Sequence, residues 1–390
     1  MHRYASWVRG LHLFHDETIT SGSLSRLSRN SPGGILFPKL EWLHWDWDVG
    51  ERSVPLTFFR LFISSHLKRV TLNTRPSQSD AHIPWRQLAA LVQLISVLPT
   101  SLESLSLLCG PEKDGPLRDA ISSLVCRCGP FLRRFDTCVH LSEAAIHHLT
   151  QLPNLRHWST IQCPPRTVPL PIFPSLENLR LEKQAAAPWV HLLASHERGT
   201  PRNGLTPATT LTDARVTLTS LYFVSATLAS SLLSSIAKFR DLVTLYVWTD
   251  CSDVGSCTFR LKDENVGDLA ASLPRLVNLQ LGRPCHSNSC HTTVTSLLSI
   301  SSHCLDLITL ETHFNTQTIV GDMQCLVNGG AGRDKAKCKL ESLVVGKMPL
   351  EVRGEDNETV VMGFKVIFPC LTGILAHDIR WCELRVQPRS

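Results

Sequence analysis

The chain has 390 residues, of which 43% are hydrophobic and 19% are charged, and its formal net charge is +5. This length and composition can bury a large core, whereas so small and dispersed an excess of positive charge does not predict a nucleic-acid interface. No run of about eighteen apolar residues predicts a membrane helix, and charged residues interrupt the N-terminus where a secretory signal needs an apolar stretch. We therefore expect a cytoplasmic or nuclear protein that binds no nucleic acid and no membrane.

A short apolar pattern, L-x-x-L-x-L, recurs along the whole chain. It is clearest in FPSLENLRL (residues 173–181) and LPRLVNLQL (residues 273–281). Thirteen copies can be aligned, and their first positions, here called anchors, lie 21 to 42 residues apart. The anchors are Val8, Leu40, Leu67, Leu102, Leu132, Leu155, Leu176, Leu218, Leu242, Leu276, Leu307, Leu340 and Leu371. This spacing is typical of leucine-rich repeats.

Each copy is predicted to be a β-strand. Residues three and five after the anchor then point to one side, and residues two, four and six point to the other. The third residue after the anchor is apolar in all thirteen copies, and one strand alone cannot bury that side, so neighbouring copies must stack in parallel. The predicted fold is an α/β leucine-rich-repeat solenoid of about 13 repeats. Such a solenoid is a curved horseshoe with parallel strands on its concave face and helices on its convex face.

Segments with helical periodicity separate the predicted strands. Examples are Ile83–Leu98, Leu117–Cys128, Ser142–Gln151, Thr227–Phe239, Lys262–Leu273 and Thr292–Cys304. Pro99, Pro153 and Pro274 follow three of these segments, where proline ends a helix. We expect one repeat domain over residues 1–390, with an irregular first repeat at 1–36 and a mobile insertion at 197–213.

The outward strand positions form the predicted binding surface, because the concave face of a solenoid is the usual site of partner binding. Exposed Trp, Tyr and Arg dominate protein interfaces. The predicted partner-binding residues are Trp42, His44, Asp46, Arg69, Arg134, Asp136, His157, Arg180, Glu182, Tyr222, Tyr246, Trp248, Gln280, Glu311 and His313. An alternative is that the charged side chains only solvate the sheet and that the aromatic ones pair across strands.

The cysteines and histidines raise the possibility of a metal or catalytic site. Adjacent repeats bring Cys251, Cys257, Cys285 and Cys290 to similar positions, but neither pair has the C-x-x-C spacing of a zinc site. We read the fourteen cysteines as reduced thiols, because no signal peptide or regular pairing accompanies them. The chain contains neither G-x-S-x-G nor H-E-x-x-H, and its glycine-rich loop lacks the Walker spacing. We therefore predict no metal, no cofactor and no catalytic residue.

Four segments together resemble the leucine-rich-repeat region of the F-box-like proteins of mushroom-forming fungi. They are FPKLEWLHW, LRRFDTCVHLSEAAIHHLTQLPNLRHW, FPSLENLRL and LPRLVNLQL, and the resemblance covers essentially the whole chain. In that family an N-terminal F-box docks on the adaptor of a cullin-RING ubiquitin ligase, and the repeats hold the substrate. Here the first repeat begins by Val8, which leaves no room for an F-box. We therefore expect adaptor binding only if an upstream F-box exists.

The sequence thus predicts a non-enzymatic protein-interaction module that holds an unidentified protein on its concave face. The resemblance implies a role like that of the substrate-recognition part of an F-box ubiquitin-ligase receptor. Two alternatives stay open. One is a repeat scaffold or ligand-sensing protein unrelated to ubiquitin, and the other is a truncated, non-functional paralogue.

Overall fold

A computed structural model provides the structure of the chain. It describes residues 7–13, 21–29, 35–48, 56–75, 85–108, 115–165, 172–182, 185–196, 218–224, 230–248, 261–282, 292–312, 318–329, 338–345 and 356–376. The described residues up to Glu177 form one compact unit, the N-terminal unit, and those from Asn178 onward form a second, the C-terminal unit. The predicted insertion at 197–213 lies outside the described residues.

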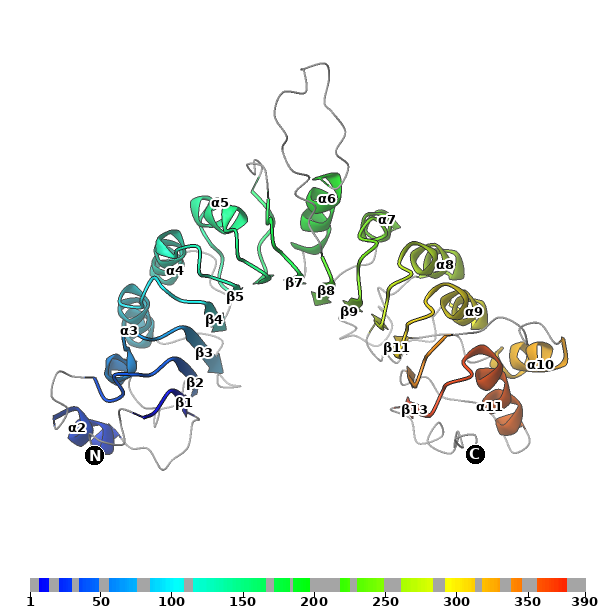
Figure 1. Cartoon of the computed structure of the whole chain (residues 1–390), viewed down its shortest axis with the longest axis horizontal. Helices are drawn as coiled ribbons and strands as arrows, with labels where there is room; N and C mark the ends of the chain where they lie inside the picture. The colour runs from blue at the N-terminus through cyan, green and yellow to red at the C-terminus, as the bar shows by residue number, and fades with distance from the viewer. Residues whose placement is uncertain are drawn as a thin grey trace, which may run out of the picture. The chain divides into compact units, whose positions relative to one another are not determined.

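The N-terminal unit contains a parallel sheet whose strands follow the order of the chain. Its strands are β1 (Gly10–Leu13), β2 (Trp42–Asp48), β3 (Arg69–Arg75), β4 (Ser104–Leu108), β5 (Arg134–Thr137) and β6 (His157–Thr160). Its helices are α2 (Ser21–Arg29), the 3-10 helix η2 (Leu56–Phe62), α3 (Trp85–Ser96), α4 (Pro116–Arg127) and α5 (Glu143–Gln151). Figure 1 shows α3, α4 and α5 side by side on one side of the sheet.

The C-terminal unit repeats this arrangement with seven strands, again parallel and in chain order. Its strands are β7 (Asn178–Glu182), β8 (Ser220–Val224), β9 (Thr244–Val247), β10 (Asn278–Leu281), β11 (Thr309–Thr312), β12 (Ser342–Val345) and β13 (Gly373–Ala376). Its helices are α6 (Ala186–His196), α7 (Ser230–Ile236), α8 (Asp263–Ser272), α9 (Val294–His303), α10 (Ile319–Gly329) and α11 (Asp356–Ile367). The predicted alternation of strand and helix in an α/β chain is therefore confirmed.

The predicted strand register is also confirmed. In the N-terminal unit the third residues after the anchors pair directly across the strands, as Leu43 does with Val70 and Leu105 with Phe135. The same positions pair in the C-terminal unit, from Leu179 to Ile374. Between the ends of the described sheet these side chains are buried, while the two end positions, in β1 and β13, are half-buried. A strand with a described neighbour on one side only cannot cover its apolar side chain fully.

All six predicted helices are present, with ends that differ by a few residues. The largest difference is at Thr227–Phe239, where α7 is seven residues long and ends at Ile236. Phe239 instead closes a turn, in which its amide donates to the Ile236 carbonyl over 3.0 Å. Ser142 caps α5 by accepting a hydrogen bond from the Ala145 amide, which satisfies an unpaired donor of the first helical turn.

The core of each unit lies between the sheet and its helices. In the N-terminal unit, the Trp158 and Phe173 rings pack with their centroids 4.8 Å apart, and both side chains are buried. In the C-terminal unit, Trp189 of α6 is fully buried. No two of the described cysteines form a disulfide. Among the described residues, no helix is both long and apolar enough to cross a membrane.

Candidate binding surface on the open face of the sheet

In each unit one face of the sheet is covered by helices, and we call the opposite face the open face. It carries the second, fourth and sixth residues after the anchors. The predicted residues described on it are Trp42, His44, Asp46, Arg69, Arg134, Asp136, His157, Arg180, Tyr222, Tyr246, Trp248, Gln280 and Glu311. The Glu182 side chain and the whole of His313 lie outside the described residues. So do Cys251, Cys257, Cys285 and Cys290, whose predicted proximity is untested.

A pocket lies on this face in the C-terminal unit, and we call it the aromatic pocket. It has a volume of about 260 Å³. Its lining consists of Arg180, Tyr222, Phe223, Tyr246, Trp248 and Gln280. Five of these six residues belong to the predicted binding surface, so the structure brings together residues that lie up to 100 positions apart in the sequence.

The strand register explains why the aromatic side chains meet. Tyr222 and Tyr246 are direct partners on β8 and β9, and their rings stack with centroids 5.0 Å apart and planes inclined by 22°. That separation matches the distance between neighbouring strands. Trp248 follows two residues after Tyr246 and therefore points to the same face. Its amide donates to the Phe223 carbonyl over 2.8 Å, which extends the strand ladder and fixes the position of the Trp248 backbone.

The pocket combines an uncharged centre with flanking charges of opposite sign. Along the row of paired strand residues, Arg180 precedes the two tyrosines, while Gln280 and then Glu311 follow them. Burial, followed by the neighbouring Tyr222 hydroxyl and the Glu311 carboxylate, raises the pKa of Tyr246 above 10.0, so its phenol is neutral near pH 7. The pocket can therefore hold an apolar or aromatic group beside the positive charge of Arg180, with Glu311 one strand beyond Gln280.

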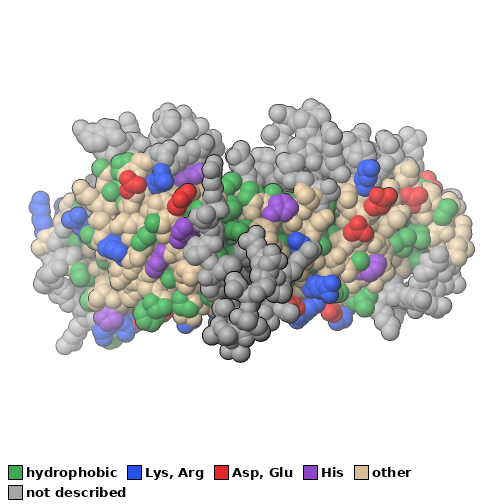
Figure 2. All heavy atoms as spheres, turned by 90° about the horizontal axis from the view of Figure 1, so that it is seen from above, with side chains coloured by type: hydrophobic (Ala, Val, Ile, Leu, Met, Phe, Trp, Pro, Cys, Tyr) green, Lys and Arg blue, Asp and Glu red, His purple; other side chains and the backbone are tan. Residues whose placement is uncertain are grey.

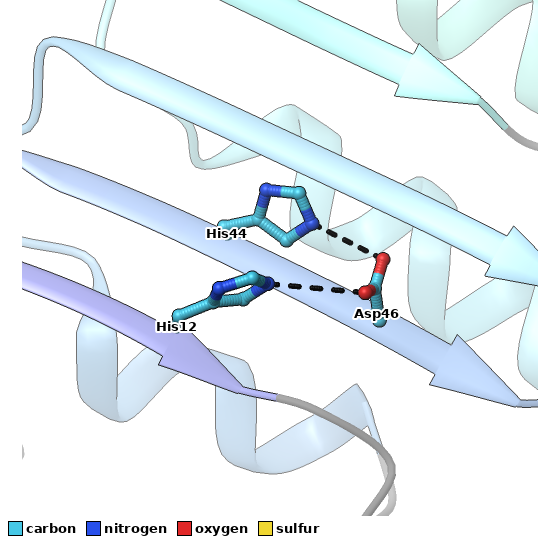
Figure 3. Close-up of side chains that lie close together, drawn as sticks. All are labelled: His12, His44 and Asp46. Atoms are coloured by element: carbon cyan, nitrogen blue, oxygen red, sulfur yellow. Dashed lines mark hydrogen bonds and ion pairs between the residues drawn. The ribbon is translucent and has the colours of Figure 1, made fainter.

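A different group of side chains occupies the open face of the N-terminal unit. His12 of β1 and His44 of β2 are paired residues, and their rings lie 4.0 Å apart between centroids. Figure 3 shows both rings turned toward the Asp46 carboxylate. The His44 Nε2 lies 3.1 Å from Asp46 Oδ1, and the His12 Nε2 lies 3.8 Å from Asp46 Oδ2. We call these three residues the His–Asp cluster.

The His–Asp cluster has the composition of a metal site. Its potential ligand atoms all lie within 4.8 Å of one another, and among the described residues it is the one group of three or more His, Cys, Asp or Glu with this property. His44 and Asp46 were predicted from the sequence as partner-binding residues, and no metal ligand was predicted. The signal that could have found the site is the pairing of two histidines at the fourth position after adjacent anchors, with an aspartate at the sixth.

Trp42 lies beside this cluster and depends on a glycine for its position. Its indole crosses over Gly10 of β1, where a Cβ atom would lie 1.8 Å from the Trp42 Cε2. Any larger residue at position 10 would therefore displace the ring. Trp42 remains 43% exposed, the same fraction as Trp248 in the other unit. Both predicted aromatic side chains are thus accessible to a partner.

The remaining predicted residues of the N-terminal unit are Arg134 and Asp136, which form an ion pair, and His157 and Arg69. Arg134 Nε donates to Asp136 Oδ2 over 2.6 Å, and the Asp136 residue is only 8% exposed. His157 is the strand partner of Arg134. Burial, followed by the Arg134 charge, lowers the pKa of His157 below 6.5. Arg69, on β3, is exposed.

Two of the predicted surface residues are less accessible than their outward positions suggest. Asp136 and Gln280 are only 8% and 7% exposed. Outward direction on a strand does not by itself mean contact with solvent. The alternative interpretation of the aromatic residues is partly confirmed as well, since Tyr222 and Tyr246 do pair across strands.

Figure 2 shows charged side chains of both signs interspersed with apolar and uncharged ones. No protein-family model matches the chain, and no curated protein sequence matches it.

Proposed function

We propose that this chain is a leucine-rich-repeat protein that acts as a non-enzymatic protein-binding module and holds its partner on the open face. The aromatic pocket is the observation that carries the proposal. Trp, Tyr and Arg are the residue types that dominate binding energy in protein interfaces, and the pocket contains all three. Its centre is apolar and its flanks are charged, which is the distribution found in interface cores and rims.

The size of the pocket favours a protein partner over a free small molecule. At about 260 Å³ it is smaller than the roughly 300–1,000 Å³ typical of sites that enclose a drug-sized ligand. It suits one protruding apolar or aromatic side chain. The surrounding strands would then supply the wider, flatter contact that a protein partner requires.

The proposed place of this module is the substrate-recognition part of an F-box ubiquitin-ligase receptor. The support is the resemblance of its repeats to those of the F-box-like proteins of mushroom-forming fungi. A substrate receptor needs a surface that recognises a protein without modifying it, and the aromatic pocket meets that need. The cullin-ligase adaptor would bind only through an F-box.

The binding proposal can be tested by affinity purification from a cell extract. Three forms would be compared, namely the wild type, the double variant Tyr246→Ala/Trp248→Ala and a matched control, Met362→Ala. Met362 is 49% exposed and lies on α11 of the same unit, away from the open face. We expect a protein that the wild type and the control retain, that the double variant loses, and that rebinds in purified form. Recovery of the same proteins with all three forms would contradict the proposal.

The ubiquitin-ligase part needs a separate experiment. An F-box fused ahead of Met1 should recruit the adaptor, and the reconstituted ligase should then ubiquitylate the captured protein. The double variant Tyr246→Ala/Trp248→Ala in the same fusion should recruit the adaptor but leave that protein unmodified. If the captured protein is bound yet never ubiquitylated, the binding module stands and the ligase role is wrong.

A further inference from the structure

We propose that His12, His44 and Asp46 bind a divalent transition-metal ion of the zinc class on the open face of the N-terminal unit. Two imidazole nitrogens and one carboxylate are ligands that Zn²⁺ takes readily. This inference is independent of the proposed protein-binding function. It rests on the geometry of the cluster, on the support of its carboxylate and on the exposure of its members.

The ligand atoms are close to the spacing that a metal ion requires. With metal–ligand distances of about 2.0–2.2 Å, two ligand atoms of a tetrahedral site lie about 3.4 Å apart. The two histidine–carboxylate distances, 3.1 Å and 3.8 Å, lie on either side of that value. Each histidine uses its Nε2 and faces a different carboxylate oxygen, as Figure 3 shows. All the potential ligand atoms lie within 4.8 Å of one another, so side-chain movements on the order of 1 Å would place all three ligands around one ion.

The strands hold the ligands in this arrangement. His12 and His44 are paired residues of β1 and β2, and Asp46 lies two residues after His44, so all three point to the same face. The strand partner of Asp46 is Asn73 of β3, whose Nδ2 donates to Asp46 Oδ1 over 3.1 Å. Hydrogen bonds of this kind orient metal-binding carboxylates. Because the ligands lie on strands of a packed sheet, little ordering remains to be done when an ion binds.

The exposure of the side chains is also that of an accessible cation site. The Asp46 side chain is 11% exposed, whereas those of His12 and His44 are 34% and 33% exposed. Burying a carboxylate costs free energy, and a metal ion would add a positive charge to the hydrogen bonds that Asn73 and His44 already make with it. The half-exposed histidines leave a path for entry from solvent. Three protein ligands also leave the fourth coordination position to water.

The first test is calorimetric titration of the metal-free protein with Zn²⁺. The fourteen cysteines can also bind zinc, so the decisive quantity is the difference between wild type and variants. We expect His12→Ala/His44→Ala to bind one ion fewer per chain than the wild type. The matched control His157→Ala removes a half-buried histidine from the open face of the same unit and should keep the full stoichiometry. Mg²⁺ should not compete, because it prefers oxygen ligands.

Two further measurements separate a metal site from loss of folding. Asn73→Ala keeps all three ligands and should weaken zinc binding about 10- to 100-fold, as loss of a ligand's hydrogen-bond partner does. In the wild type, zinc should shift the imidazole NMR signals of two histidines, identified by their loss in His12→Ala and His44→Ala. If zinc binds the wild type and the double variant with equal stoichiometry and affinity, the cluster is only a hydrogen-bonded group and the proposal is wrong. Unshifted signals of His12 and His44 at saturating zinc would overturn it equally.

Discussion

The open faces of the two units carry different side chains on nearly the same framework. At the fourth position after the anchor, the N-terminal unit presents His12, His44, Thr71, Ser106, Asp136 and Ser159. The C-terminal unit presents Arg180, Tyr222, Tyr246, Gln280, Glu311, Val344 and Leu375 at the same position. In the N-terminal unit this row contains two adjacent histidines, whereas in the C-terminal unit it contains two adjacent tyrosines between Arg180 and Gln280.

The inward positions of the two units do not differ in this way. The third residue after the anchor is apolar throughout, and it is buried in every strand between β1 and β13. Burial of these side chains stabilises the sheet, so their chemical type is restricted. The outward side chains contribute little to that core and are free to differ. Each unit can therefore carry its own binding chemistry without a change in its fold.

The largest expected effect tests the shared framework. Leu105→Ala in the N-terminal unit and Leu310→Ala in the C-terminal unit should each lower the free energy of unfolding by about 2–5 kcal/mol, because both leucines are fully buried. Glu311→Ala, next to Leu310 but on the open face, should cost well under about 1 kcal/mol. Urea unfolding measures all three. Equal losses for Leu310 and Glu311 would mean that the two faces of the strand have been assigned wrongly.

The next effect concerns binding and compares two tryptophans of equal exposure. Trp248 borders the aromatic pocket, whereas Trp42 lies beside the His–Asp cluster, and both are 43% exposed. With a partner identified by affinity purification, Trp248→Ala should weaken binding by about 1–4 kcal/mol, as for a residue at an interface hot spot. Trp42→Ala should have the smaller effect. The reverse ranking, measured calorimetrically, would move the binding centre to the N-terminal unit.

A smaller effect concerns the pH dependence of stability, to which His157 of the N-terminal unit should contribute. The pKa of His157 is lowered in the folded protein, so folding favours its neutral form. The stability that this preference contributes is present above the unfolded value of 6.5 and is lost as the pH falls through the folded value. His157→Gln should therefore flatten the decline in melting temperature between about pH 7 and pH 5. An unchanged decline would show that other groups cause it.

The smallest effect concerns the aromatic pocket and is spectroscopic. The chain has three tyrosines, and burial beside Tyr222 and Glu311 raises the pKa of Tyr246 above 10.0. Phenolate absorbance should therefore contain a late component as the pH is raised, and Tyr246→Phe should remove it. Because the folded pKa is raised, the associated stability is present below pH 10 and is lost at higher pH. A titration of Tyr246 at or below 10.0 would indicate a more open pocket.

The strands and their register could be predicted because they depend on a local pattern. Leu43, Leu179 and Leu279 were assigned to the inward side from spacing alone, and all three are buried. The period-two alternation of a strand and the stacking of equivalent positions leave few other arrangements. The helix ends were less predictable, as at Phe239, because a turn and a last helical residue differ by one hydrogen bond.

The candidate sites could be predicted only in part. Tyr222, Tyr246 and Trp248 were predicted as partner-binding residues from the sequence, since they occupy outward positions on adjacent repeats. Whether these side chains line a pocket or form a continuous apolar surface, with Arg180 on one side, depends on the distances between strands and on side-chain conformations. The low exposure of Asp136 and Gln280 could not be predicted either, because it depends on side-chain conformations that strand alternation does not fix.

The sequence by itself determined which residues form strands, which side of each strand faces the core and which residues pair across the sheet. These features follow from apolar spacing, since a misregistered strand would expose its leucines to water. Only the tertiary structure decided that the His12 and His44 imidazoles turn toward opposite oxygens of Asp46 and that Asn73 holds that carboxylate. The physical reason is that outward side chains have several rotamers and no core to choose among them, so their hydrogen-bond partners across the strands decide their directions.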